Sequence, residues 1–83
     1  IDRSDEAFRS LFDEFRPRVR RFMLQQGADS ELADELAHET LVTVWRKAQL
    51  YSSDKGSPTA WIFTIARNLR IDRIRKQRVW QEL

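Results

Sequence analysis

Cysteine is absent from this chain of 83 residues, and glycine and proline occur only twice each. Without a thiol the chain can form no disulfide and perform no thiolate chemistry, which fits a reducing compartment. Two glycines and two prolines leave few turns. No apolar run approaches the roughly 18–20 residues that span a bilayer, and no secretory signal pattern is present. These absences exclude a transmembrane or disulfide-stabilised class and leave one small domain with a modest core.

The first apolar stripe is interrupted by a proline. Its members have the i, i+3, i+4, i+7 spacing of one buried helix side, and they are Phe8, Leu11, Phe12 and Phe15. Pro17 lacks a backbone donor and restricts the residue before it, so we expect a kink or a break, with Pro17 opening a second helical piece. That piece ends at Gly27, a residue suited to the position after a helix C-terminus.

Two further helices are predicted. Ser30, with acids behind it, is typical of an N-cap, and an apolar face then runs over residues 32–48. Ser57 followed by Pro58 predicts the start of the last helix. Its core stripe consists of Ile62, Ile65, Ala66 and Leu69. Because no segment alternates as a strand would, the predicted fold class is all-α, a compact bundle of three or four helices.

Positive charge is concentrated near the C-terminus. Residues 67–78 contain six cations and one acid, a local net charge of +5 in a chain whose net charge is only +2. Two or three cations would suit the C-terminal helix dipole, but that effect fades within the last turn. Six cations therefore favour a polyanion-binding surface, and nucleic acid is the first candidate.

Uncharged side chains among these cations suggest that the surface reads bases as well as binding phosphate. Thr64 and Asn68 lie four residues apart on one helix side, with Trp61 and Phe63 nearby and Tyr51 in the preceding loop. Amide and hydroxyl groups pair with base edges, and aromatic faces accept unstacked bases. A single Trp at helical spacing is more often a core residue, so both roles stay open for Trp61.

Negative charge gathers in a separate segment. Residues 29–39 contain five acids and no Lys or Arg. Acids at the start of a helix are ordinary, but Glu31, Glu35 and Glu39 are spaced i, i+4, i+8 and repel one another mildly. A solvated helix face and a docking site for a basic protein surface are both compatible with this pattern.

Other charged residues offer weaker signals. Four arginines flank Pro17, namely Arg16, Arg18, Arg20 and Arg21. We expect them to be solvated or paired with the acidic helix; a secondary phosphate or partner contact is the alternative. His38 is the only histidine, and with no cysteine a transition-metal site is not expected. No nucleophile–base pair or glycine-rich phosphate loop appears, so we predict a protein that is not an enzyme.

Two separated motifs carry a family resemblance. The stretch ADELAHETLVTVW at 33–45 is followed, after a polar loop, by AWIFTIARNLRIDRIR at 60–75. Together they resemble region 2 of bacterial sigma factors of the extracytoplasmic-function (ECF) group, and residues 8–27 are similar to that family's opening helices. The resemblance implies a transcription-initiation domain that binds core RNA polymerase and recognises and melts the promoter −10 element. It also implies a bacterial cytoplasmic protein without cofactor, metal or small-molecule substrate.

The resemblance assigns roles to particular residues. It places contacts to the clamp helices of the polymerase largest subunit at Asp34, Glu35, His38 and Glu39. It places contacts to the non-template DNA strand at Tyr51, Ser52, Ser53, Asp54, Lys55, Gly56, Ser57, Trp61, Thr64, Arg67, Asn68, Arg70, Ile71 and Arg75. The loop would capture a flipped base, Asn68 would read a base, and the arginines would hold phosphates.

Two departures from the family pattern matter. His38 stands where a glutamine is common, so the polymerase contact can differ in detail. Residues 1–83 contain no helix-turn-helix for a −35 element, so we expect them to be a region 2 domain, without region 4, from a longer sigma factor. Members of the group are usually held inactive by an anti-sigma factor, which is the expected second protein partner.

Two alternative functions remain. One is a helical adaptor whose charged faces bind only proteins, such as an anti-sigma factor. The other is a helix-turn-helix domain that reads duplex DNA. The second is disfavoured because the loop over residues 49–57 is longer than the usual turn of about three or four residues.

Overall fold

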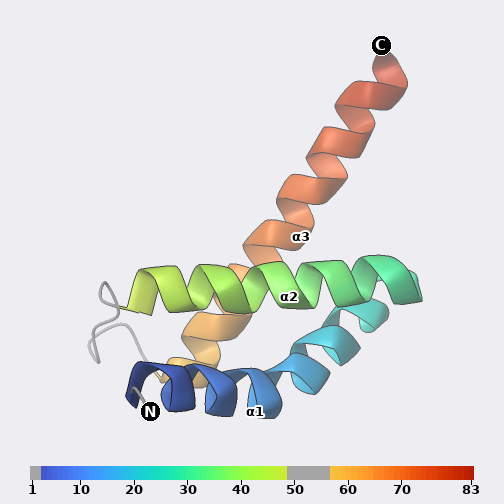
Figure 1. The fold of residues 1–83 in the computed structure, drawn as a ribbon. Helices are drawn as coiled ribbons and strands as arrows, with labels where there is room; N and C mark the ends of the chain where they lie inside the picture. Colours follow the sequence, from blue (N-terminus) through green and yellow to red (C-terminus); the bar gives the residue numbers. More distant parts are fainter. Residues whose placement is uncertain (1–2, 49–56) are drawn as a thin grey trace.

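The computed structural model describes residues 3–48 and 57–83, and these ranges contain three helices and no strand. Helix α1 spans Arg3–Gln25, α2 spans Ser30–Lys47 and α3 spans Pro58–Glu82. In Figure 1, α1 and α2 lie side by side, and α3 crosses behind them before its C-terminal half extends away from the bundle. The all-α prediction is confirmed, with three helices rather than four in the described ranges.

Helix α1 is continuous across Pro17, so a break at this residue is the wrong alternative. The ribbon does bend in the second half of the helix (Figure 1). Phe15 is 7% exposed and Val19 is fully buried, so the helix is packed against the core on both sides of the proline. Burial of these neighbours keeps the segment helical although one backbone hydrogen bond is missing.

The end of α1 is a Schellman motif. Gly27 has a φ of +94°, a left-handed conformation that costs glycine little. The Ala28 amide donates to the Met23 carbonyl at 3.0 Å, and the Gly27 amide donates to the Leu24 carbonyl at 3.1 Å. The predicted stop at Gly27 is confirmed.

The two remaining helix starts are capped by side chains. Asp29 Oδ1 accepts from the Leu32 amide at 2.8 Å, so the cap of α2 lies one residue before the predicted Ser30. Ser57 Oγ accepts from the Ala60 amide at 3.1 Å, and Pro58 is the first residue of α3, as predicted. Both side chains satisfy an amide that the helix itself leaves without a partner.

All three helices contribute to one core. Its buried apolar residues are Phe15, Val19, Met23, Ala28, Ala33, Leu36, Ala37, Leu41, Val44, Ile62, Ile65 and Ala66. Thr40 is the one buried polar residue among those described, and its hydroxyl donates to the Leu36 carbonyl at 2.7 Å. None of the described helices combines the length and the apolar character needed to cross a membrane.

Candidate nucleic-acid interface

One side of α3 carries most of the predicted DNA-contacting residues that the structure describes. Because α3 is unbroken from Pro58 to Glu82, positions spaced i, i+4, i+7 and i+11 fall on one row along it. This outer row consists of Thr64, Asn68, Ile71 and Arg75. All are exposed except Ile71, which is half-buried, and the exposed Arg67 flanks the row. The helix thus brings an amide, a hydroxyl and two cations together at the surface.

The two polar groups on the outer row differ in what they can offer. The Thr64 hydroxyl donates to the Ala60 carbonyl at 2.9 Å, so its proton is used and its oxygen can act only as an acceptor. The Asn68 side chain makes no hydrogen bond within the described part of the chain, so both its amide donors and its carbonyl oxygen are available. Asn68 is therefore the side chain on this row best suited to read a base edge.

Trp61 lies on the bundle side of this region. It is half-buried and packs against the core, and it lines an apolar hollow together with Leu11, Val44 and Trp45. This placement supports its role as a core residue over that of an exposed stacking platform. Residues 51–56 of the predicted loop lie outside the described residues, and Ser57 is seen only as the cap of α3.

Arg70 points away from the outer row. Its guanidinium donates to the Gln26 carbonyl at 3.1 Å, at the C-terminal end of α1. Its Nε is buried and has no hydrogen-bond partner. A cation at this position stabilises the carbonyl end of a helix dipole. Arg70 therefore joins α3 to α1, and the structure does not bring it together with Asn68 and Arg75.

Arg73 bridges α3 to the acidic helix. Its guanidinium lies 3.2 Å from Glu35 and 3.7 Å from Glu39, and its side chain is 28% exposed. These two acids repel each other along α2, so a shared cation between them relieves that repulsion. The chain itself therefore supplies, through Arg73, part of the positive charge that a basic partner surface would bring to these acids.

The other predicted polymerase-contacting residues also lie on the exposed side of α2. Asp34 pairs with Arg20 at 2.6 Å, and the same arginine donates to Ser30 Oγ at 2.8 Å. The predicted pairing of the arginines around Pro17 with the acidic helix is thus confirmed for Arg20. The exposed His38 ring lies edge-on to Phe12, with ring centroids 5.6 Å apart.

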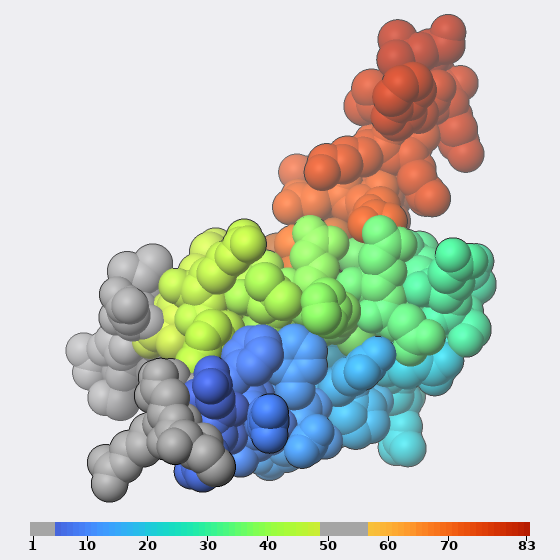
Figure 2. Space-filling view, in the orientation of Figure 1, coloured from blue at the N-terminus to red at the C-terminus, as the bar shows by residue number. Residues whose placement is uncertain are grey.

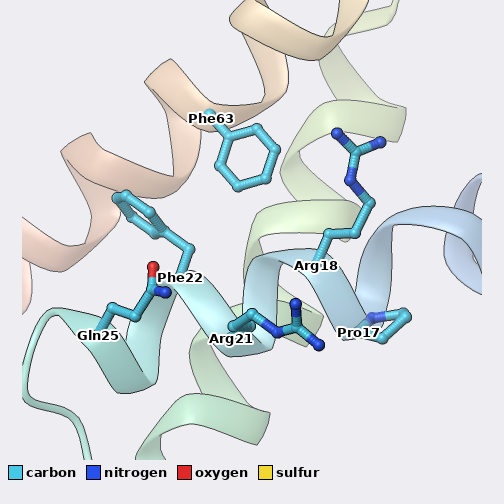
Figure 3. A pocket seen from close by; sticks show the side chains of 6 residues that line it. All are labelled: Pro17, Arg18, Arg21, Phe22, Gln25 and Phe63. Atoms are coloured by element: carbon cyan, nitrogen blue, oxygen red, sulfur yellow. The ribbon is translucent and has the colours of Figure 1, made fainter.

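An open groove between α1 and α3 was not predicted from the sequence. It is lined by Pro17, Arg18, Arg21, Phe22, Gln25 and Phe63 (Figure 3). Phe22 is half-buried and packs against the core, so only part of its ring faces the groove. The available signal was the helical i, i+4 spacing of Pro17, Arg21 and Gln25, which places them on one side of α1 away from the core stripe.

The C-terminal end of α3 projects from the bundle and exposes apolar side chains. In Figure 2 the C-terminal part of α3 stands clear of the bundle. Val79, Trp80 and Leu83 are exposed there, by 58%, 77% and 91%. Across residues 3–48 and 57–83, no group of three or more His, Asp or Glu side chains could hold a metal ion.

Comparison with known proteins identifies related sequences. Residues 11–79 match the family described as sigma-70 region 2. The ECF RNA polymerase sigma factor RpoE of Cereibacter sphaeroides is 45% identical over 76 residues, which cover 92% of this chain and 42% of that protein. SigK, an ECF RNA polymerase sigma factor of Mycobacterium sp. (strain KMS), is 33% identical over 76 residues, covering 92% of this chain and 39% of SigK.

A solved structure shares the fold. It is the crystal structure of Rhodobacter sphaeroides SigE in complex with the anti-sigma ChrR, with a TM-score of 0.81 and 44% identity. The similarity covers 87% of this chain and 44% of the matched chain. The present chain thus spans about two fifths of the length of these curated relatives.

Proposed function

The chain belongs to the sigma-70 region 2 family, and we propose that it binds core RNA polymerase and captures the melted non-template strand of the promoter −10 element. The observation that carries this proposal is the outer row of α3, which lies within the matched residues 11–79 and exposes Asn68 between cations. Its role is non-enzymatic and needs no cofactor, because binding energy alone shifts the equilibrium toward open DNA.

The strand-capturing part of the proposal assigns separate tasks to separate groups. Asn68 reads one base through its amide, while Arg67 and Arg75 bind phosphates. The loop over residues 51–57 receives an extruded base. Unstacking a base costs a few kcal/mol, and binding of the base and its backbone offsets this cost. Arg70 is the least supported member of the predicted set, because its guanidinium already binds the end of α1.

The polymerase-binding part places a basic surface of the enzyme against α2. Asp34, Glu35, His38 and Glu39 are all exposed on α2, and the three carboxylates supply the negative charge. An anti-sigma factor is a second partner, since the structurally similar SigE was solved in complex with the anti-sigma ChrR. Such an inhibitor would act by covering the surfaces proposed for polymerase or DNA.

The test is binding of single-stranded DNA. Short oligonucleotides with a randomised centre are selected on the chain, and the tightest binder is then changed one base at a time. We expect the single strand to bind more tightly than its duplex and the affinity to fall steeply with salt. Asn68→Ala should relax base choice at one position, removing about 1–3 kcal/mol of discrimination there. Equal loss at every position would contradict the base-reading role.

The adaptor alternative makes the opposite prediction. If the charged faces bind only proteins, no oligonucleotide binds at low salt, whereas a purified protein partner binds tightly. The duplex-reading alternative predicts that the duplex binds better than either strand. One titration series with single strand and duplex therefore separates the three functions.

A further inference from the structure

The groove between α1 and α3 has the chemistry of a nucleotide subsite. It has a volume of about 470 Å³, and its six lining residues include two arginines and no acid. Figure 3 shows Phe63 extending from α3 into the space between Phe22 and Arg18, which come from α1. The groove is therefore positively charged and partly aromatic, and it opens to solvent.

The two rings are held in place by contacts within the protein. The centroids of Phe22 and Phe63 are 5.6 Å apart in an edge-to-face arrangement. The Arg18 guanidinium lies 5.8 Å from the Phe63 centroid and 4.8 Å from that of the buried Phe15. Stacking on such pre-positioned rings costs little ordering entropy, because the rings are already fixed.

The polar groups of the groove complement the rest of a nucleotide. Arg21 is exposed and its guanidinium makes no ion pair or hydrogen bond within the described ranges, so it is available to a phosphate. Gln25 lies one turn further along α1, and its amide can pair with a base edge. Ring faces, a cation and an amide are the groups with which proteins hold single-stranded nucleic acid.

Helical spacing places the groove residue Phe63 next to the outer row of α3. Phe63 precedes Thr64, and Arg67 lies one turn after Phe63 on the same side of the helix. A strand bound along Thr64 and Asn68 would reach the groove over the exposed Arg67. On the far side Glu14 is exposed one turn before Arg18, so the positive surface ends there.

We infer that this groove binds a second nucleotide of the single-stranded DNA, with its base against Phe63 and Phe22 and its phosphate at Arg21. The inference rests on the proposed single-strand function and adds a subsite separate from the loop and from Asn68. It also assigns the phosphate-contact role, which the sequence left open for the arginines around Pro17, to Arg21, whereas the Arg18 guanidinium lies over the Phe15 and Phe63 rings. Arg16 and Arg20 take no part.

The first experiment is an abasic scan of the tightest-binding oligonucleotide selected above. We expect at least two positions at which removal of the base weakens binding by about fivefold or more. The loss at one position should disappear in Asn68→Ala, and the loss at another should disappear in Phe63→Leu. Comparing intact and abasic DNA on both the parent protein and the variant forms a double-mutant cycle, which isolates the contact between one base and one side chain.

The second experiment uses a charge-matched pair of variants that does not disturb the packed rings. Arg21→Gln should lower affinity about fivefold at about 0.1 M salt and reduce the slope of log affinity against log salt by about 0.7. Arg16→Gln removes the same charge from the same helix, but Arg16 is exposed and does not line the groove. Arg16→Gln should therefore change the affinity and the salt slope much less than Arg21→Gln does. Thermal unfolding monitored by circular dichroism shows whether each variant remains folded.

The outcomes separate the inference from the proposed function. If an Asn68-dependent position is found but none depends on Phe63, and Arg21→Gln behaves like Arg16→Gln, the subsite is wrong and the proposed function stands. If no oligonucleotide binds, both are wrong. If Arg21→Gln weakens only the binding of a protein partner, the groove is a protein-docking site and the nucleotide assignment is overturned.

Discussion

The inner side of α3, which packs on α1 and α2, and its outer row carry cations with different uses. On the inner side, Arg70 binds the end of α1 and Arg73 lies between two acids of α2. Arg67 and Arg75 make no such contact within the described part of the chain. A count of the cations on a helix is therefore larger than the number that are available to bind a polyanion. Two of the six cations in residues 67–78 hold the protein's own helices together.

The largest expected effect is on stability, and it distinguishes the inner side of α3 from its outer row. Ile62 is 2% exposed on the inner side, so Ile62→Ala should lower the free energy of unfolding by about 2–5 kcal/mol. Thr64→Ala on the outer row should change it by less than about 0.5 kcal/mol. Urea denaturation measures both. If Ile62→Ala leaves too little folded protein, Ile62→Val should still cost about 0.5–1.5 kcal/mol.

The next effect concerns Arg70. Arg70→Met keeps an apolar stem but removes the hydrogen bond to the Gln26 carbonyl, and it should cost about 1–2 kcal/mol of stability. Arg67→Met, one turn earlier, is the control and should be nearly neutral in stability. A strong loss of DNA affinity in Arg70→Met without loss of stability would mean that Arg70 belongs functionally to the outer row.

Arg75 tests the outer row for phosphate binding. Arg75→Gln should weaken every single-stranded oligonucleotide by a similar factor, about fivefold at about 0.1 M salt, while base preference is retained. Arg9→Gln removes one positive charge from the exposed part of α1 and serves as the control. Fluorescence anisotropy over a salt series gives the comparison. A change in base preference in Arg75→Gln would show that this side chain reads sequence.

The smallest expected effect is at the bridge between α3 and α2. Arg73→Gln should lower stability by only about 0.2–1 kcal/mol, because Glu35 and Glu39 are 59% and 48% exposed and water screens the pairs. Lys76→Gln is the control, since Lys76 makes no ion pair in the described ranges. A double-mutant cycle with Glu35→Gln measures the coupling. A coupling energy of zero would show that the ion pair between Arg73 and Glu35 does not stabilise the fold, so that Arg73 would be no different from Arg75 in this respect.

Much of the fold was predictable because its signals are local. The cap at Ser57 with Pro58 and the stop at Gly27 depend on the residues at those positions, and both predictions are confirmed. The cap of α2 was misplaced by one residue because Asp29 and Ser30 both suit that position. The continuity of α1 was not predictable, since the preference of proline is local while the burial that overrides it comes from other helices.

The candidate site was predictable only in part. The helical spacing of Thr64 and Asn68 is enough to place both on one row once the helix is known. The pairing of Arg70 with Gln26 joins residues 44 positions apart, and nothing in the local pattern indicates it. The groove likewise depends on Phe22 and Phe63 meeting across two helices.

By itself, the sequence determined the all-α fold class and most helix ends, the separation of an acidic segment from a basic one, and the sigma-70 region 2 family. Helical periodicity, capping and charge are properties of neighbouring residues and can be read along the chain. The tertiary structure alone decided which arginines remain available to a ligand and that an aromatic groove lies beside them. Long side chains reach across helix crossings, and the crossing geometry is set by core packing rather than by the residues that it brings together.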